Sequence, residues 1–302
     1  MIENLSTGAF GAGIGRLLPV ELAALEKAKT PLRLFLTLSM QRSGQHLIIR
    51  WLCQSLGEAI HFNFCHFRRR GLALALTPKT GRRVVYQGDA IDDSGIQTAA
   101  DLYPSLPAGR FAALLYSLED HDPADPLLRR IIHRYRHCLR VLVVLRDPYN
   151  WLASTMQLQD EPADTTRRRL ERCKRYLTNA LHEDWPLSCP VTVVKYDRFV
   201  LDPAYRRQLA RELEVPMRPA AEAALQEVPA FGGGSSFSGT APGADLRNAV
   251  FERWRHFVDD PHYLAVAQDR ELAALDSALF PDVPSAAARR AALGVRADSD
   301  AA

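Results

Sequence analysis

Short apolar segments without helical periodicity recur along this chain, and they alternate with segments of helical pattern. The clearest are Leu32–Ser39 (LRLFLTLS) and 139–145 (LRVLVVL). Strands of this composition are buried on both faces, as they are in parallel sheets covered by helices. Further strands are expected at 59–64, 83–88, 111–118 and 191–196. The pattern predicts an α/β fold of three layers, in which helices flank a mostly parallel central sheet.

The remaining patterns divide the chain into one domain and two terminal segments. Helices are expected at 47–56, 126–136, 165–182, 205–213, about 245–258 and 261–279, and a loop at 214–244. Residues 1–30 are rich in Gly and Ala and are expected to be poorly ordered, apart from a short helix at 21–29. Residues 283–302 are expected to form a flexible tail. The domain itself should span 31–282, which is long enough to bury a substantial core.

Charge and composition exclude several classes of protein. The net charge of +3 does not indicate the basic stripe of a nucleic-acid binder. The chain contains no run of about 18 apolar residues, so no integral membrane segment is expected. A signal peptide is not expected either, because Glu3 stands where such a peptide would carry positive charge. The five cysteines lack the spacing of zinc ligands, which favours buried free thiols in a reducing compartment. A cytoplasmic protein is therefore expected.

The first predicted strand is followed by a polar loop, Met40–Gly44, and then by a helix, which is a P-loop-like strand–loop–helix unit. Ligands of parallel sheets bind at the carboxyl ends of strands, and amides at a helix N-terminus favour a phosphate. Gly44 would allow close approach of the backbone, and Arg42 and Ser43 would add a charge and a hydroxyl. The GxxxxGK[ST] pattern and its lysine are absent. An ordinary turn with an exposed arginine is the alternative.

A second loop follows the apolar strand at 139–145, where Arg146 stands at the carboxyl end. Pro148 suits an early position in the next helix, and Ser154 lies on that helix eight residues after Arg146. A guanidinium group and a hydroxyl are suitable donors to a phosphate. The alternative is that Asp147 caps the helix and Arg146 lies on the surface.

Together the two loops resemble the sulfotransferases that use 3'-phosphoadenosine 5'-phosphosulfate (PAPS). In that family a strand leads into a K/R-S-G loop and a helix, to which QRSGQHL at 41–47 is similar. Later an apolar strand ends in Arg, with Pro two residues on and Ser eight residues on, as Arg146, Pro148 and Ser154 do here.

A third stretch, 191–215, is similar to a later part of the same family. It contains an apolar strand, a Y-(E/D)-x-(F/L) turn, a DP pair and a helix, matched by Tyr196, Asp197, Phe199, Asp202 and Pro203. The resemblance covers about residues 32–258. The chain resembles bacterial members of the family in particular, many of which have Arg rather than Lys in the first loop.

The resemblance implies PAPS as co-substrate, and it assigns two sets of ligands. The 5'-phosphosulfate would be held by Arg42, Ser43, Gly44, Gln45 and His46, and the 3'-phosphate by Arg146 and Ser154. Many members have Thr where Gln45 and His46 stand. The family's late RKG segment is absent, and its counterpart is sought at 232–247, with Ser235, Ser236 and Arg247 as candidate ligands.

The implied reaction is transfer of a sulfuryl group to a hydroxyl or amine by in-line displacement, with no metal. The sequence does not identify the acceptor: a small molecule such as a phenol, a carbohydrate, a lipid-linked sugar and a protein tyrosine all remain open. Arg42 would stabilise the bridging oxygen, and a side-chain base would take the acceptor proton. In cytosolic members the base is a His after the corresponding strand, which points here to the cluster Glu119, Asp120 and His121.

Within this cluster Glu119 and His121 are equal candidates for the base, and His46 is a third. His66 is a further alternative should the cluster lie far from Ser43. The other interpretation of the cluster is a solvated acidic turn in which Asp122 caps the next helix.

Two other functions remain open from the sequence. One is a phosphotransferase with a degenerate P-loop, for which Asp89, Asp92 and Asp93 are candidate Mg²⁺ ligands although the loop lacks a phosphate lysine. The other is a non-catalytic nucleotide-binding protein of the same fold.

Overall fold

The computed structural model describes most of the expected domain. The described residues are 33–57, 59–62, 65–68, 71–74, 84–86, 89–90, 113–157, 163–226, 250–284 and 286–295. The predictions for the segment 1–30, and for Asp92, Asp93, Ser235, Ser236 and Arg247, lie outside these residues.

The core of the fold is a sheet with the strand order β6-β5-β2-β7-β1-β8-β9. The strands are β1 (Arg33–Ser39), β2 (Ala59–Phe62), β5 (Val84–Tyr86), β6 (Asp89–Ala90), β7 (Ala113–Glu119), β8 (Leu139–Leu145) and β9 (Val191–Lys195). The run from β2 to β9 is parallel, and β5 and β6 add antiparallel pairs at one edge. The predicted α/β class with a mostly parallel sheet is confirmed.

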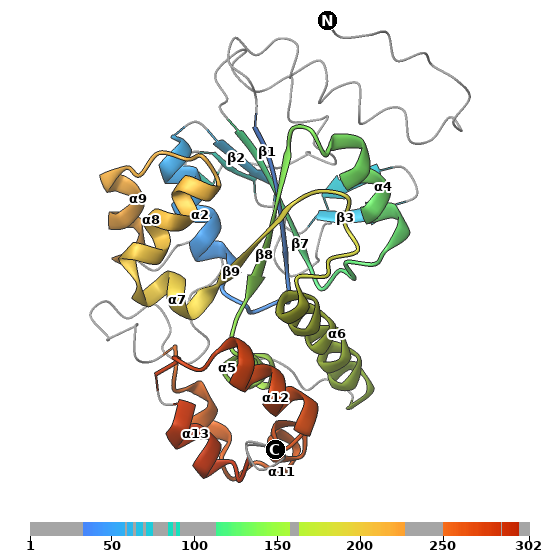
Figure 1. The fold of residues 1–302 in the computed structure, drawn as a ribbon, viewed down its shortest axis with the longest axis vertical. Coiled ribbons are helices and arrows are strands. Elements are labelled where there is room, and N and C mark those ends of the chain that lie inside the picture. The colour runs from blue at the N-terminus through green and yellow to red at the C-terminus, as the bar shows by residue number, and fades with distance from the viewer. Residues whose placement is uncertain are drawn as a thin grey trace, which may run out of the picture.

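Helices cover both faces of this sheet (Figure 1). One face carries α2 (Gln45–Leu56), α7 (Tyr196–Leu201), α8 (Pro203–Glu212) and α9 (Pro219–Ala223), and the other carries α4 (Pro126–Tyr135) and α6 (Ala163–His182). Successive side chains of a strand point to opposite faces. Accordingly Phe35 packs with Trp51 in one core, whereas Leu36 packs with Tyr176 in the other.

The register of the strands brings the carboxyl ends of three of them together. Ser39 at the end of β1 is paired with Glu119 of β7 and with Val144 of β8. The loops that follow these strands are therefore neighbours, although β1 and β8 are about a hundred residues apart in sequence. This is the edge at which the sequence predicts a ligand.

A group of helices lies beyond this edge of the sheet (Figure 1). It contains α5 (Pro148–Met156), the 3₁₀ helix η3 (Arg253–Phe257), α11 (Pro261–Ala267), α12 (Arg270–Leu279) and α13 (Ala286–Ala292). The single helix predicted at 261–279 is divided in two, since Asp269 caps α12. The flexible tail predicted at 283–302 is wrong for α13, because Arg289 on this helix is fully buried.

Several short elements depart from the prediction. Strands β3 (Cys65–Arg68) and β4 (Gly71–Leu74), which were not expected, pair in a separate antiparallel sheet. The turn expected after Lys195 is helix α7. The predicted loop at 214–244 begins with α9 and η2 (Ala224–Gln226). These segments are too short to show a hydrophobic period.

Two other expectations can be compared with the described residues. Cys53 and Cys173 are buried free thiols as predicted, whereas Cys138 is exposed and Cys189 is half-buried. Among the helices in the described segments, none has both the length and the apolar character needed to cross a membrane.

Candidate active site at the carboxyl edge of the sheet

The loop between β1 and α2 has a tightly constrained backbone. Arg42 has a φ of 71° and Gly44 has a φ of 88°, both in the left-handed region. A Cβ atom at Gly44 would lie 2.2 Å from Cε2 of Tyr196, so only glycine fits beneath this ring. The ring of Tyr196 thus closes one side of the loop, and Gly44 begins helix α2.

The hydroxyl of Ser43 is a buried polar group at the start of α2. Ser43 is buried, and its Oγ has no hydrogen-bond partner among the described residues. Buried hydroxyl groups are nearly always satisfied, because an unmade bond costs about 1–3 kcal/mol. Ser43 lies just before the N-terminus of α2, where the helix amides favour an anion.

Three arginines lie close together beside this loop, and two of them contact Ser154. Ser154 Oγ on α5 accepts a hydrogen bond from Arg253 Nη1 at 2.8 Å and from Arg42 Nε at 3.4 Å. Arg146 Nη1 donates to the carbonyl oxygen of Arg42 at 3.3 Å, and its guanidinium lies 5.2 Å from the ring centre of Tyr196. The three guanidinium groups come from three separate parts of the chain.

The electrostatics of this cluster favour an anion. Burial, and then the charge of Arg146, lower the pKa of Arg253 to about 9. The same two causes lower the pKa of Arg42, and the charge of Glu119 partly opposes them. Like charges held this close in a buried site repel one another. A bound phosphate or sulfate would relieve that repulsion and accept their hydrogen bonds.

The structure therefore brings together most of the residues predicted to hold the nucleotide. Arg42, Ser43, Gly44, Arg146 and Ser154 all lie at this edge of the sheet. Sequence reasoning placed Arg146 in an open cleft or on the surface, yet it is 5% exposed and donates to Val250 O at 2.6 Å. Arg146 thus also holds the backbone of the first loop at Arg42 and the backbone at Val250.

Arg253 was missed by sequence reasoning. It lies in a segment expected to be an ordinary helix, and the late ligands were sought at 232–247 instead. The only signal in the sequence was its position between aromatic residues after that glycine-rich segment, in FERWRHF.

Glu119 at the end of β7 faces the first turn of α2. Gln45 Nε2 donates to Glu119 Oε1, and His46 Nε2 lies 4.0 Å from the same oxygen. Gln45 Oε1 in turn accepts from Ser39 Oγ at 2.7 Å, so the side chain of Gln45 turns toward the sheet. Burial, and then the charge of Asp120, raise the pKa of Glu119 from its ordinary value of 4.5 to about 8.

The other two members of the predicted acidic cluster have different contacts. Asp120 Oδ1 accepts from the amide of Gln41 at 2.9 Å, so Asp120 holds the first loop in place. His121 Nδ1 donates to Glu119 O at 2.9 Å, and burial lowers the pKa of His121. Asp122 does not cap α4, because Asp125 accepts from the amides of the first turn of that helix.

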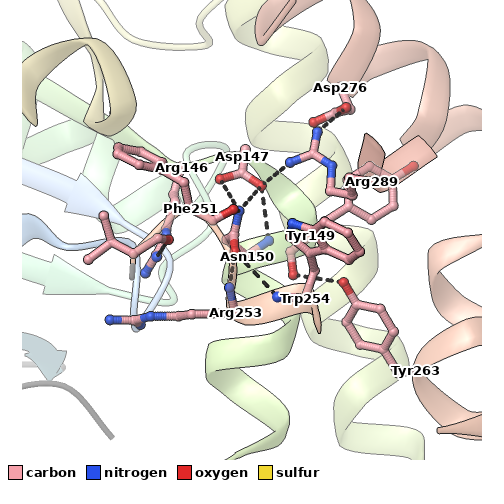
Figure 2. A network of polar contacts seen from close by, with 11 residues as sticks. Arg146, Asp147, Tyr149, Asn150, Phe251, Arg253, Trp254, Tyr263, Asp276 and Arg289 are labelled. Carbon is pink, nitrogen blue, oxygen red and sulfur yellow. Dashed lines mark hydrogen bonds and ion pairs between the residues drawn. The ribbon is translucent and has the colours of Figure 1, made fainter. Parts of the chain in front are cut away.

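A network of polar side chains connects Arg253 with Asp147, Asp276 and Arg289 (Figure 2). Asp147 caps α5 by accepting from the amide of Asn150 at 2.9 Å, as one interpretation of the sequence proposed. Asp147 also pairs with Arg289 of α13, which pairs in turn with Asp276 of α12. No pattern in the sequence indicated this network. As to metals, the described residues contain no cluster of three or more His, Cys, Asp or Glu side chains suited to a metal ion.

Comparison with known proteins gives distant similarity to solved structures. No family model matches the chain, and no curated protein matches it. Among solved structures, the chain is similar to the sulfotransferase domain from the Synechococcus PCC 7002 olefin synthase. The two share 14% sequence identity with a TM-score of 0.42, over 80% of this chain and 94% of that chain.

Proposed function

We propose that this protein is a sulfotransferase that moves a sulfuryl group from PAPS to a hydroxyl or amine acceptor. The observation that carries the proposal is the convergence of Arg42 and Arg253 on Ser154, with Arg146 bonded to the carbonyl oxygen of Arg42, beside a strand–loop–helix turn. Such a site fits a ligand with several negative charges better than it fits a neutral one.

The two halves of the site suit the two ends of PAPS. The backbone at 42–46, with the side chain of Arg42 and the buried hydroxyl of Ser43, would hold the 5'-phosphosulfate at the N-terminus of α2. Arg146 and Ser154 would hold the 3'-phosphate, and we add Arg253 to this set because it contacts Ser154.

In the proposed reaction the acceptor oxygen or nitrogen attacks sulfur while the bond from sulfur to the bridging oxygen breaks. Adenosine 3',5'-bisphosphate leaves with the electron pair of that bond. Arg42 and the amides of α2 would stabilise the charge on the leaving oxygen.

Glu119 is our proposed base for the acceptor proton. Its pKa near 8 is close to the working pH, which suits general-base catalysis. It lies against the first turn of α2, and its Oε2 has no hydrogen-bond partner among the described residues. His46, 4.0 Å from the other oxygen, and His121 are the alternatives. We expect the acceptor to be a small molecule or a saccharide, free or lipid-linked.

Thermal unfolding with adenosine 3',5'-bisphosphate and with AMP tests the proposed site. A ligand at about 100 times its Kd stabilises the folded state by roughly 2.7 kcal/mol. We expect the bisphosphate to raise the melting temperature far more than AMP, because AMP lacks the 3'-phosphate that Arg146 and Arg253 would contact. Equal shifts from the two nucleotides would contradict the assignment of Arg146, Ser154 and Arg253.

Turnover separates the proposal from its alternatives. Labelled PAPS, incubated with the protein and a mixture of phenols and sugars in EDTA, should yield sulfated product. Transfer of phosphate from ATP in the presence of Mg²⁺, without transfer of a sulfuryl group from PAPS, would indicate a phosphotransferase. Binding of the bisphosphate without turnover on any acceptor would indicate a non-catalytic nucleotide-binding protein.

A further inference from the structure

Helix α13 places an arginine in the interior of the C-terminal group of helices. Arg289 is fully buried, and its Nη1 and Nη2 lie 2.7 Å from Asp147 Oδ1 and 2.6 Å from Asp276 Oδ2. Its guanidinium also lies 4.5 Å from the ring centre of Tyr149 (Figure 2). Buried ion pairs contribute little net stability compared with apolar packing, but in some proteins they fix one arrangement of the chain.

The ion pair continues into a clamp formed by Asn150. Asn150 Nδ2 donates to Asp147 at 3.0 Å and to the carbonyl oxygen of Phe251 at 3.0 Å. Asn150 Oδ1 accepts from the amide of Arg253 at 2.8 Å. The side chain of Asn150 therefore joins Asp147 to both ends of the segment from Phe251 to Arg253.

This clamp fixes the backbone from which Arg253 reaches the anion site. With its amide bound to Asn150, Arg253 extends its guanidinium to Ser154 Oγ at 2.8 Å. Arg289 orients the carboxylate of Asp147, that carboxylate orients the amide of Asn150, and Asn150 orients Arg253. The contacts form one continuous chain from α13 to Ser154.

We propose that Arg289 is a positioning residue for the anion site, acting through Asp147 and Asn150 to hold Arg253 beside Ser154. Helix α13 would then help to hold the proposed nucleotide site in its binding geometry. The nature of the ligand rests on the proposed function, but the positioning role applies to any multiply charged anion bound by the three arginines.

Two variants break the chain of contacts at different points. Arg289→Lys keeps the charge but loses the fork that spans Asp147 and Asp276, and Asn150→Ala removes the clamp but leaves both ion pairs in place. Arg206→Met is the matched control, because Arg206 is also buried and pairs with Glu222 at 2.8 Å, on the face of the sheet that carries α8.

Calorimetric titration with adenosine 3',5'-bisphosphate and with inorganic pyrophosphate gives the readout, and melting temperatures without ligand report folding. We expect Arg289→Lys and Asn150→Ala to bind both anions about tenfold more weakly, the loss expected for a misplaced charged hydrogen bond. In an Arg253→Ala background, Arg289→Lys should cause no further loss, since the two residues act in series. Arg206→Met should melt earlier but keep the affinity of the wild type.

Three results would overturn the positioning role. They are unchanged affinity in folded Arg289→Lys and Asn150→Ala, an equal loss in Arg206→Met, or additive losses in the double variant. If Arg289→Lys does not fold, Asn150→Ala decides the question. A wild-type protein that binds pyrophosphate but not the bisphosphate would contradict the proposed function, and the pyrophosphate titrations would then test the positioning role alone.

Discussion

Arg253 shows how one guanidinium group can define the chemistry of this site. It donates to Ser154 at 2.8 Å while its own amide is held by Asn150, so both ends of the residue are fixed. A planar fork held in this way can donate two parallel hydrogen bonds to one phosphate, whereas an ammonium group is a compact point charge without that fixed geometry.

We expect Arg253→Lys to weaken binding of adenosine 3',5'-bisphosphate by about tenfold, the equivalent of one charged hydrogen bond. Binding of AMP should change little, because AMP lacks the 3'-phosphate. Calorimetric titration with the two nucleotides measures the difference. Arg255→Lys is the control, since Arg255 lies two residues away and pairs with Glu252 on the surface. The same loss in both variants would rule out a specific contact.

Glu119 links the pH of the medium to both stability and turnover. Its pKa is about 8 in the folded protein and near its ordinary value of 4.5 in the unfolded chain. Between these values the folded state retains a proton that the unfolded state releases. This group therefore lowers stability as the pH rises from about 4.5 to about 8, by up to about 1.4 kcal/mol for each unit of pH.

We expect Glu119→Gln to flatten this decline, because glutamine stays neutral and can still accept from Gln45. Denaturant unfolding of wild type and variant at a series of pH values tests this, with the exposed Glu252→Gln as control. Parallel curves for wild type and Glu119→Gln would contradict a buried, protonated Glu119. The same variant should lose about 10²–10⁴-fold in turnover if Glu119 is the base, while wild-type turnover should rise as the pH approaches 8.

The loop between β1 and α2 depends on close packing between two elements. Helix α7 places Tyr196 against Gly44, and the Arg146 guanidinium lies over the same ring. The loop, the end of β8 and the start of α7 are thus held as one unit around the N-terminus of α2.

We expect Gly44→Ala to lower stability and to weaken nucleotide binding, because its Cβ would collide with Tyr196 and push the loop outward. Gly294→Ala is a matched control. Gly294 also has a positive φ, of 64°, but its nearest neighbour would lie 3.9 Å from the new Cβ. The control should cost only the backbone strain, about 1–2 kcal/mol, and should keep the wild-type affinity for the bisphosphate. An unchanged Kd for Gly44→Ala would mean that the loop tolerates the shift.

The elements also show what could be predicted from the sequence. The apolar runs at β1 and β8 are distinctive because strands covered on both faces have almost no polar positions, and their loops follow directly. Strands β3 and β4 have no such composition. The contacts of Arg289 could not be predicted, since it lies 142 residues from Asp147 in an alanine-rich segment that resembles a frayed end. Arg253 was hidden for a similar reason: local pattern carries no information about a partner about a hundred residues away.

Across the whole molecule, the anion site joins the sheet to the C-terminal helices. Arg42 and Arg146 follow strands, whereas Arg253 is held through α5 and α13. A ligand that contacts all three arginines therefore binds two parts of the fold at once.

We expect the bisphosphate to slow amide hydrogen exchange in α13, although α13 itself does not reach the anion site. Binding stabilises the closed arrangement of the segments that it bridges, and exchange reports local opening. Mass spectrometry of exchange with and without the nucleotide measures this. Helix α4, which covers the sheet, serves as the internal control and should change less. Equal protection of the two helices would argue against coupling through Arg289.

The ion pair between Asp147 and Arg289 also has a consequence for the order of biosynthesis. Translation produces β8 and α5 long before α13, and chains generally begin to fold from the N-terminus as they are made. Until Arg289 has been synthesised, the carboxylate of Asp147 lacks its ion-pair partner, and Asn150, which holds the segment that carries Arg253, is oriented less firmly. The sheet can assemble early, but the ability to bind a multiply charged anion should appear only once α13 has docked. A nascent chain would therefore pass through a stage in which it is folded at its centre but lacks the complete site that we propose for the nucleotide.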